Sequence, residues 1–200
     1  MQLHIAHATI HLTLPPGMPG QLMEFSPTLH GAARPAEPVS AALTPPAHGE
    51  YWPGQGGRYI CTLPALLGVP ARHLVVGEGE AEDLSFGPAI DVPGAVSQLD
   101  GPANTAALLG ADRGHAAAAM AAAYTADGHT DFYLPSRLDL VMAHICAPQL
   151  FKKSGWYWSS TQGSRSGAFV QYFSDGRSCW YGKDGGRRVR AFRWVQDLNA

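Results

Sequence analysis

Hydrophobic and polar positions alternate along the second half of the chain with the period of two that is typical of β-strands. In the segment 156–161, Trp156 and Trp158 would share one face of an extended strand, while Tyr157 and Ser159 would share the other. The hydroxyl side chains after Trp158 predict that this strand leaves a hydrophobic core and enters a polar turn. Similar patterns predict strands over 73–77, 168–173, 177–181 and 188–194.

Apolar residues repeat at spacings of three and four between Ser136 and Pro148, which predicts an amphipathic α-helix. Ser136 and Asp139 have the spacing of a capping box at its start, and Pro148 would end it. We expect the apolar stripe of this helix to be buried against a sheet, and it consists of Leu138, Val141, Met142 and Ile145.

An alanine-rich region predicts a second helical segment over 106–109 and 115–124, interrupted by two glycines. Because its apolar side chains are small, this segment has to pack closely on a neighbouring element to be stable. Asn104 or Thr105 is expected to cap its start.

The first 47 residues differ in pattern from the rest of the chain. Residues 1–14 alternate in a way that predicts one bulged strand or two short strands. Residues 26–48 hold five prolines among many alanines and serines, which is typical of an extended linker. We therefore divide the chain into an N-terminal strand segment with a Pro/Ala-rich linker, 1–47, and a domain formed by residues 48–200.

Composition narrows the class of protein. Twenty-three glycines and 16 prolines favour short strands and long loops over a helical bundle. The net charge of −2 argues against a nucleic-acid binder, which usually carries a basic stripe.

The sequence contains no run of about 18 apolar residues, so we predict no membrane span. Residues 1–14 hold no lysine or arginine, so we expect no signal peptide and predict synthesis in the cytoplasm, with packaging into a virion as a possible fate.

Candidate catalytic nucleophiles lack supporting patterns. Cys61, Cys146 and Cys179 include no Cys-x-x-Cys pair, which fits buried thiols or a reducing compartment and leaves one disulfide open. The segment 163–167 has an arginine at its centre, so it is not the nucleophile elbow of a serine hydrolase. Serine, histidine and aspartate occur at no informative spacing, and we predict no catalytic residue.

Candidate metal ligands also lack the required spacing. Three N-terminal histidines would converge only on a helix, whereas their surroundings have the pattern of a strand: His4, His7 and His11. An acidic group could offer oxygens to calcium, but it lacks the spacing of a calcium loop: Glu78, Glu80, Glu82 and Asp83. We interpret the acidic group as a solvated loop, and expect no bound metal and no cofactor.

The motifs of the last third follow one another in a specific order. They are Phe-Tyr-Leu-Pro-Ser (132–136), the helix, Tyr-Trp-Ser-Ser-Thr (157–161), Phe-Ser-Asp-Gly (173–176), Lys-Asp (183–184) and Val-Arg-Ala-Phe-Arg (189–193). This ordered set resembles the C-terminal-domain family of the collagen-like adhesin Lcl, a former domain of unknown function. The segment 52–57, Trp-Pro-Gly-Gln-Gly-Gly, is similar to openings found in phage-borne relatives.

The resemblance implies an α+β, C-type-lectin-like fold in the branch of the formylglycine-generating enzymes and of the variable proteins of diversity-generating retroelements. It implies a mixed sheet of short strands with two helices and long loops. The function it implies is ligand or receptor binding without catalysis, in a phage or prophage tail. The expected partner is a protein or cell-surface receptor, with other phage particle proteins and a second copy as further candidates, and no nucleic acid.

The resemblance also assigns roles to residues. The ligand-contacting positions would be Arg165, Val170, Tyr172, Arg177, Cys179, Trp180, Tyr181, Asp184 and Arg187. The scaffold positions would be Trp156, Trp158, Ser159, Ser160, Thr161, Phe173, Lys183, Arg190 and Arg193. Because Arg and aromatic side chains dominate binding hot spots, we expect one accessible surface to carry Tyr172, Arg177, Trp180 and Tyr181. Arg190 and Arg193 should face opposite sides of the last strand, one paired and the other nearer solvent.

Two alternatives remain open. One is an enzyme on the same fold, such as a formylglycine-generating oxidase, although that activity relies on a cysteine pair near the C-terminus and Cys179 stands alone there. The other is a structural particle protein in which the hairpin face is buried in an oligomer. Calcium-dependent sugar binding is disfavoured, because the Glu-Pro-Asn and Gln-Pro-Asp motifs of true lectins do not occur.

Overall fold

The computed structural model describes residues 44–111 and 113–196. The predicted strand segment in 1–14, its three histidines and nearly all of the linker lie outside the described residues. The described strands are β1 (Tyr51–Trp52), β2 (Gly57–Leu63), β3 (Arg72–Leu84), β4 (Trp156–Gln162), β5 (Gly167–Tyr172), β6 (Ser178–Gly182) and β7 (Arg187–Gln196). The described helices are α1 (Gly101–Leu109), α2 (Ala116–Ala123) and α3 (Arg137–Cys146), with 3-10 turns η1 (Pro93–Ala95) and η2 (Pro148–Leu150).

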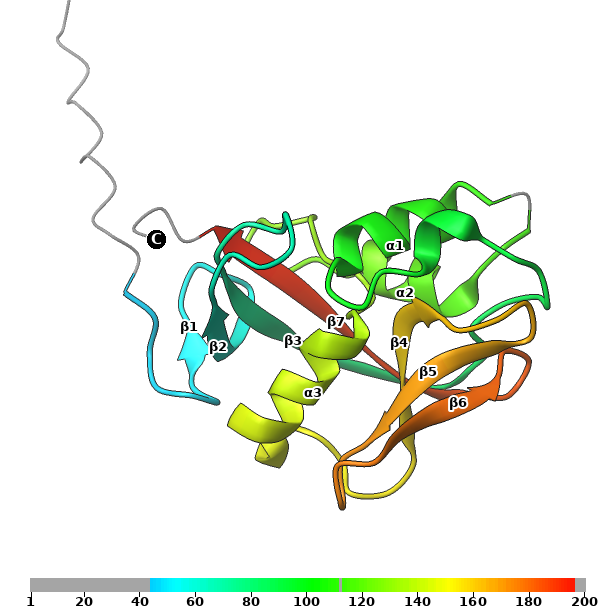
Figure 1. Ribbon diagram of the computed structural model, residues 1–200. Helices are drawn as coiled ribbons and strands as arrows, with labels where there is room; N and C mark the ends of the chain where they lie inside the picture. Colours follow the sequence, from blue (N-terminus) through cyan, green and yellow to red (C-terminus); the bar gives the residue numbers. More distant parts are fainter. Residues whose placement is uncertain (1–43, 112, 197–200) are drawn as a thin grey trace, which may run out of the picture. The chain divides into compact units, whose positions relative to one another are not determined.

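The seven strands form one sheet in the order β1-β2-β3-β7-β4-β5-β6 (Figure 1). All neighbours are antiparallel except β4 and β7, which run parallel and are paired at Tyr157 and Arg188. The predicted α+β class with a mixed sheet is therefore confirmed. The described residues form three helices rather than the two that we predicted, because α1 and α2 are separate.

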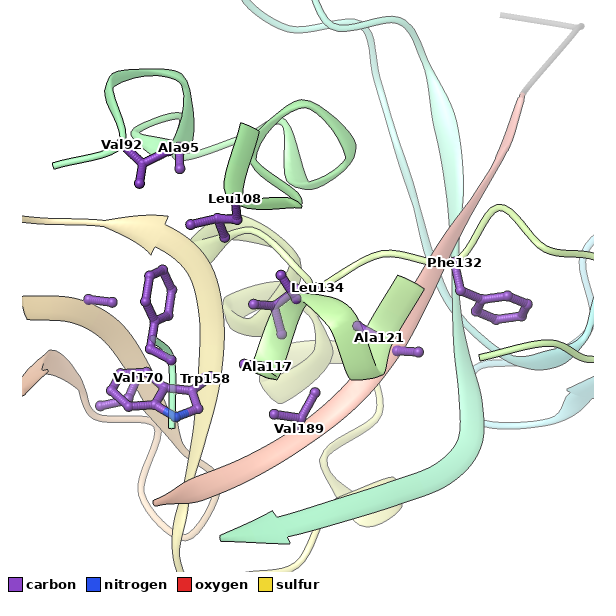
Figure 2. Close-up of a cluster of buried hydrophobic side chains, with 14 residues drawn as sticks. Val92, Ala95, Leu108, Ala117, Ala121, Phe132, Leu134, Trp158, Val170 and Val189 are labelled. Carbon is purple, nitrogen blue, oxygen red and sulfur yellow. The ribbon is translucent and has the colours of Figure 1, made fainter. Parts of the chain in front are cut away.

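Each face of the sheet is covered by helices. Trp158 and Val170 lie in one hydrophobic core with small and apolar side chains of α1 and α2 (Figure 2). Tyr157 and Phe173 lie in a second core, where α3 contributes Leu140. Strand β4 therefore presents a buried aromatic ring to each core, as its alternating pattern predicts.

The predicted polar turn after Trp158 is wrong. Strand β4 continues to Gln162, and the three hydroxyl residues Ser159, Ser160 and Thr161 are fully buried. Their hydroxyl groups donate to backbone carbonyls of neighbouring segments, at 3.0 Å to Phe169, 3.2 Å to Pro135 and 2.8 Å to Ser97. Hydroxyl groups are tolerated inside the core because each has such a partner.

The buried face of α3 differs from the predicted stripe. Its buried residues are Asp139, Leu140 and Ala143, while Ile145 is 65% exposed. The predicted capping box is present, with Ser136 N–H donating to Asp139 Oδ2 at 2.8 Å. Because this carboxylate turns inward, the helix rotates and buries the row at 139, 140 and 143. The other stripe residues are only partly buried: Leu138, Val141 and Met142.

The start of α1 also differs from its prediction. Asp100 is the N-cap, and its Oδ1 accepts a hydrogen bond from Ala103 N–H at 2.8 Å. Asn104 and Thr105 are buried within the helix instead. Asn104 Nδ2 donates to Ser160 Oγ at 3.2 Å, so this side chain ties α1 to β4.

The acidic residues that we interpreted as a solvated loop lie within β3. Glu80 accepts hydrogen bonds from Tyr157 Oη at 2.6 Å and from Arg188 at 3.0 Å, and it forms an ion pair with Lys152 at 3.2 Å. Glu82 is also paired with both Lys152 and Arg188. Basic side chains from β7 and from the segment before β4 thus compensate the acidic strand.

Arg190 and Arg193 lie on opposite sides of β7, but neither is nearer solvent, so that part of the prediction is wrong. Arg190 donates to the carbonyls of Leu150 and Gly77. Arg193 Nε donates to Asp131 Oδ1 at 2.6 Å. Both side chains are buried, since each guanidinium has acceptors that replace its hydration.

The inward face of α3 can be tested with a matched pair of truncations. Leu140→Ala should lower the free energy of unfolding by about 2–5 kcal/mol, because it leaves a cavity in the second core. Ile145→Ala should change it by less than about 0.5 kcal/mol, because this side chain is exposed. Urea denaturation measures both values, and equal losses in the two variants would contradict the observed helix orientation.

Asp139 should make stability depend on pH. Burial raises the pKa of this carboxyl group from 3.8 to about 6. A raised pKa means that the folded state holds the proton of Asp139 more tightly than the unfolded state does. The contribution of this proton to the stability of the fold is therefore complete below about pH 4 and is lost as the pH rises through 6. Between pH 4 and 7, the unfolding free energy of the wild type should fall relative to that of Asp139→Asn by up to roughly 3 kcal/mol. Parallel pH profiles for the two proteins in urea denaturation would contradict this assignment.

Candidate binding surface

The hairpin of β5 and β6 distributes the predicted ligand-contacting residues over two faces. Trp180 is paired with Phe169, and Tyr181 with Ala168, so adjacent residues of β6 point to opposite sides. Tyr172 and Tyr181 lie on the side of the first core, whereas Trp180 lies on the other side. The expectation of one surface carrying all four predicted residues is therefore wrong for Trp180.

Three aromatic rings on the first side are in contact. Trp156 lies at the centre, with its ring centroid 5.0 Å from that of Tyr172 and 5.2 Å from that of Tyr181. Each end of the row carries a guanidinium group. Arg177 lies 5.8 Å from the Tyr172 ring, and Arg187 lies 4.4 Å from the Tyr181 ring. We call this row of five residues the aromatic strip.

The aromatic strip is accessible to solvent. Its three rings and Arg187 are half-buried, and Arg177 is exposed. Arg177 Nε forms an ion pair with Asp175 at 2.8 Å. Arg187 forms no ion pair within the described part of the chain, so no carboxylate holds the guanidinium at this end of the strip.

Cys179 lies between the two arginines on the same side of β6. Partial burial raises the pKa of its thiol, and the positive charges of Arg177 and Arg187 oppose that rise. The thiol is therefore predominantly protonated at neutral pH, and the aromatic strip offers contact area and guanidinium donors rather than a thiolate nucleophile.

A cleft of about 260 Å³ adjoins the aromatic strip. Trp156 and Arg187 belong to both the strip and the cleft, and Asp83 lies on the acidic side of the cleft. The remaining lining residues are Glu82, Gly155, Gly186 and Arg188. The strip and the cleft together combine flat apolar surface, guanidinium donors and carboxylate acceptors within one area.

Trp180 belongs to a different surface on the opposite side of the hairpin. Its ring, 51% exposed, packs on Phe169, and the guanidinium of Arg137 lies 3.9 Å from the Phe169 ring. A shallow groove of about 460 Å³ begins beside Trp180 and runs along the 163–167 loop. Gly163 has to be a glycine here, because a Cβ atom would collide with the Trp180 ring.

Lys183 holds the turn between β6 and β7 in place. Its Nζ is buried and donates to Gln162 Oε1 at 2.6 Å and to the Ile90 carbonyl at 2.7 Å. Burial lowers the pKa of this ammonium group. The Lys183 carbonyl in turn accepts a hydrogen bond from Phe86 N–H at 2.9 Å. The turn that precedes Arg187 is thus connected to β4 and to the 86–92 loop.

The remaining assignments divide by burial. Val170 is 1% exposed and packs in the first core, so it is a core residue and cannot contact a ligand. Arg165 and Asp184 are exposed but lie outside the strip, near the groove. Trp156, expected as scaffold, is half-buried at the centre of the strip. All other expected scaffold residues are buried: Trp158, Ser159, Ser160, Thr161, Phe173, Lys183, Arg190 and Arg193.

All three cysteines are free thiols. Cys61 on β2 and Cys146 at the end of α3 lie in the same core, where each thiol influences the other, and sequence spacing did not indicate this. Burial is the main cause that raises the pKa of Cys61 to about 12, with a further contribution from Cys146. These two thiols are remote from Cys179 in the sequence and belong to the second core.

Within residues 44–111 and 113–196, no group of three or more His, Cys, Asp or Glu side chains is placed to hold a metal ion. No helix in these ranges is long and apolar enough to cross a membrane. A scan against protein-family models finds no match, and a search of curated proteins finds none either. The geometry of the surface and the sequence resemblance therefore carry the functional proposal.

Proposed function

We propose that this protein is a non-catalytic receptor-binding protein with a C-type-lectin-like fold, and that it acts in a phage or prophage tail. The aromatic strip is the proposed contact surface for a protein or glycan on the host cell. The observation that carries this proposal is the row of three half-buried rings with a guanidinium group at each end.

The chemistry of the strip supports recognition. Tyrosine and tryptophan offer large contact areas at a small cost in side-chain entropy, and arginine adds directional donors. The rings stand on the paired strands β4, β5 and β6, and the opposite side of β4 packs in the second core through Tyr157. Such a support keeps the contact geometry in place while the exposed side chains vary, as in the variable proteins that the sequence resembles.

Cell binding should depend on the strip. Fluorescently labelled full-length protein, incubated with a panel of intact bacterial cells, should bind some of them in flow cytometry. The double variant Arg177→Ala and Tyr181→Ala should bind at least about tenfold more weakly, because it removes one guanidinium group and one aromatic ring of the strip. Its melting temperature should change little, since both side chains are at least partly exposed.

A matched control replaces the same residue types elsewhere. Arg113 is exposed and Tyr51 is half-buried, and both lie outside the strip. The double variant Arg113→Ala and Tyr51→Ala should bind like the wild type. Equal losses in both double variants would refute the strip as the contact surface, and a wild-type protein that binds no cell in the panel would refute host recognition.

A further inference from the structure

Strand β6 is the last strand of the sheet, and one of its edges has no neighbour within the described residues. Figure 1 shows it at the outer side of β5. Tyr172 N–H donates to the Arg177 carbonyl at 2.8 Å, which fixes the phase of the β5–β6 ladder. Backbone groups of Cys179 and Tyr181 therefore point to β5, and those of Ser178 and Trp180 point outward.

This edge lacks the usual protection against pairing. Natural edge strands carry lysine, proline, inward-pointing charges or bulges that prevent another strand from adding to them. The five residues of β6 are Ser-Cys-Trp-Tyr-Gly, with no charge and no proline. The β5–β6 register runs without a bulge from the first residue of β6 to the last. A half-exposed tryptophan stands at the centre of this strand.

We propose that β6 pairs antiparallel with β6 of a second copy of this chain, with the two-fold axis at Trp180. The two sheets then join into one continuous sheet across the axis. Trp180 bonds through its backbone to the same residue of the second copy, and Ser178 bonds to Gly182 of that copy. The pairing itself depends on the backbone of β6 and on the side of the hairpin that carries Trp180, and not on the proposed receptor binding. Only its consequence for avidity rests on that proposed function.

The side chains of β6 are complementary to themselves in this register, as a two-fold interface requires. On the Trp180 side, the large indole stands between Ser178 and Gly182, whose small size leaves room for the indole of the other copy. On the strip side, Cys179 of each copy faces Tyr181 of the other. No like charges face each other within the paired segment, whereas Arg177 comes near the turn that carries Asp184 in the other copy.

A second copy fits this edge better than an unrelated peptide for two reasons. The indole packs on Phe169 with one side and is half-exposed, so a partner strand with an apolar residue at its centre can cover the remaining surface. The same pairing places both aromatic strips on one side of the joined sheet, where they can bind one cell surface together. Two linked sites raise the overall avidity without any new contact.

Sedimentation velocity of the full chain between about 1 and 100 µM tests the pairing, with a concentration-dependent dimer as the expected result. Trp180→Lys should weaken self-association at least about tenfold, because an edge lysine opposes strand addition. The matched control is Ile145→Lys, which places the same charge on another exposed apolar residue and should leave the dimer intact. Circular dichroism confirms that both variants are folded.

A crosslinking experiment tests the register and does not depend on the folding of the lysine variant. Residues that exchange backbone hydrogen bonds across antiparallel strands lie about 5.5 Å apart at Cα, which suits a disulfide. With Cys179→Ser as background, Trp180→Cys should form a disulfide-linked dimer in the presence of oxidised glutathione, and Ser178→Cys should not. A monomer at all concentrations, a dimer that survives Trp180→Lys, or linkage through Ser178→Cys in place of Trp180→Cys would each overturn the proposal. Capture of an added extended peptide by a monomeric chain would overturn it as well.

Discussion

The double-sided burial of β4 is the constraint on which the rest of this structure depends. Trp158 and Tyr157 are neighbours on this strand, and each is almost completely buried in a different core. Large aromatic rings on both faces of one strand can both be buried only if other elements cover both faces of the sheet. Helices α1 and α2 satisfy one side and α3 the other. The buried hydroxyls of Ser160 and Thr161 then bind β4 to the segments before these helices, through the carbonyls of Pro135 and Ser97.

Strands β1, β2, β3 and β7 form one half of the sheet, and β4, β5 and β6 form the other. Ion pairs and hydrogen bonds of Glu80 connect these halves where the backbone pairing is shortest. Strands β4 and β7 share one parallel pair, at Tyr157 and Arg188. Both of these side chains donate to Glu80 on β3, the strand on the far side of β7. One carboxylate therefore holds three neighbouring strands in register. Tyr157 and Arg188 donate to the carboxylate of Glu80, so burying this charge within the sheet costs less free energy than burying an unpaired carboxylate would.

The β5–β6 hairpin serves two surfaces at once. Its side toward the first core carries the aromatic strip, and its other side carries Trp180 on Phe169. The edge between these sides is a plain row of backbone donors and acceptors. The proposed recognition would therefore use side chains of this hairpin, and the proposed association would use mainly its backbone.

Local patterns in the sequence determined the type and position of most elements in the second half. The capping box at Ser136 and the alternation from Trp156 to Trp158 depend only on neighbouring residues, and both are present. Glu78, Glu80 and Glu82 were predicted as a loop because of their charge. Only the tertiary structure places Arg188 and Lys152 beside this segment, and these partners allow the acidic residues to lie in β3. Tertiary structure alone decided the inward rotation of α3, because it depends on Asp139 entering the core. It also decided which residues form the aromatic strip, since strand parity separates Trp180 from Tyr181 and only packing brings Trp156 between Tyr172 and Tyr181.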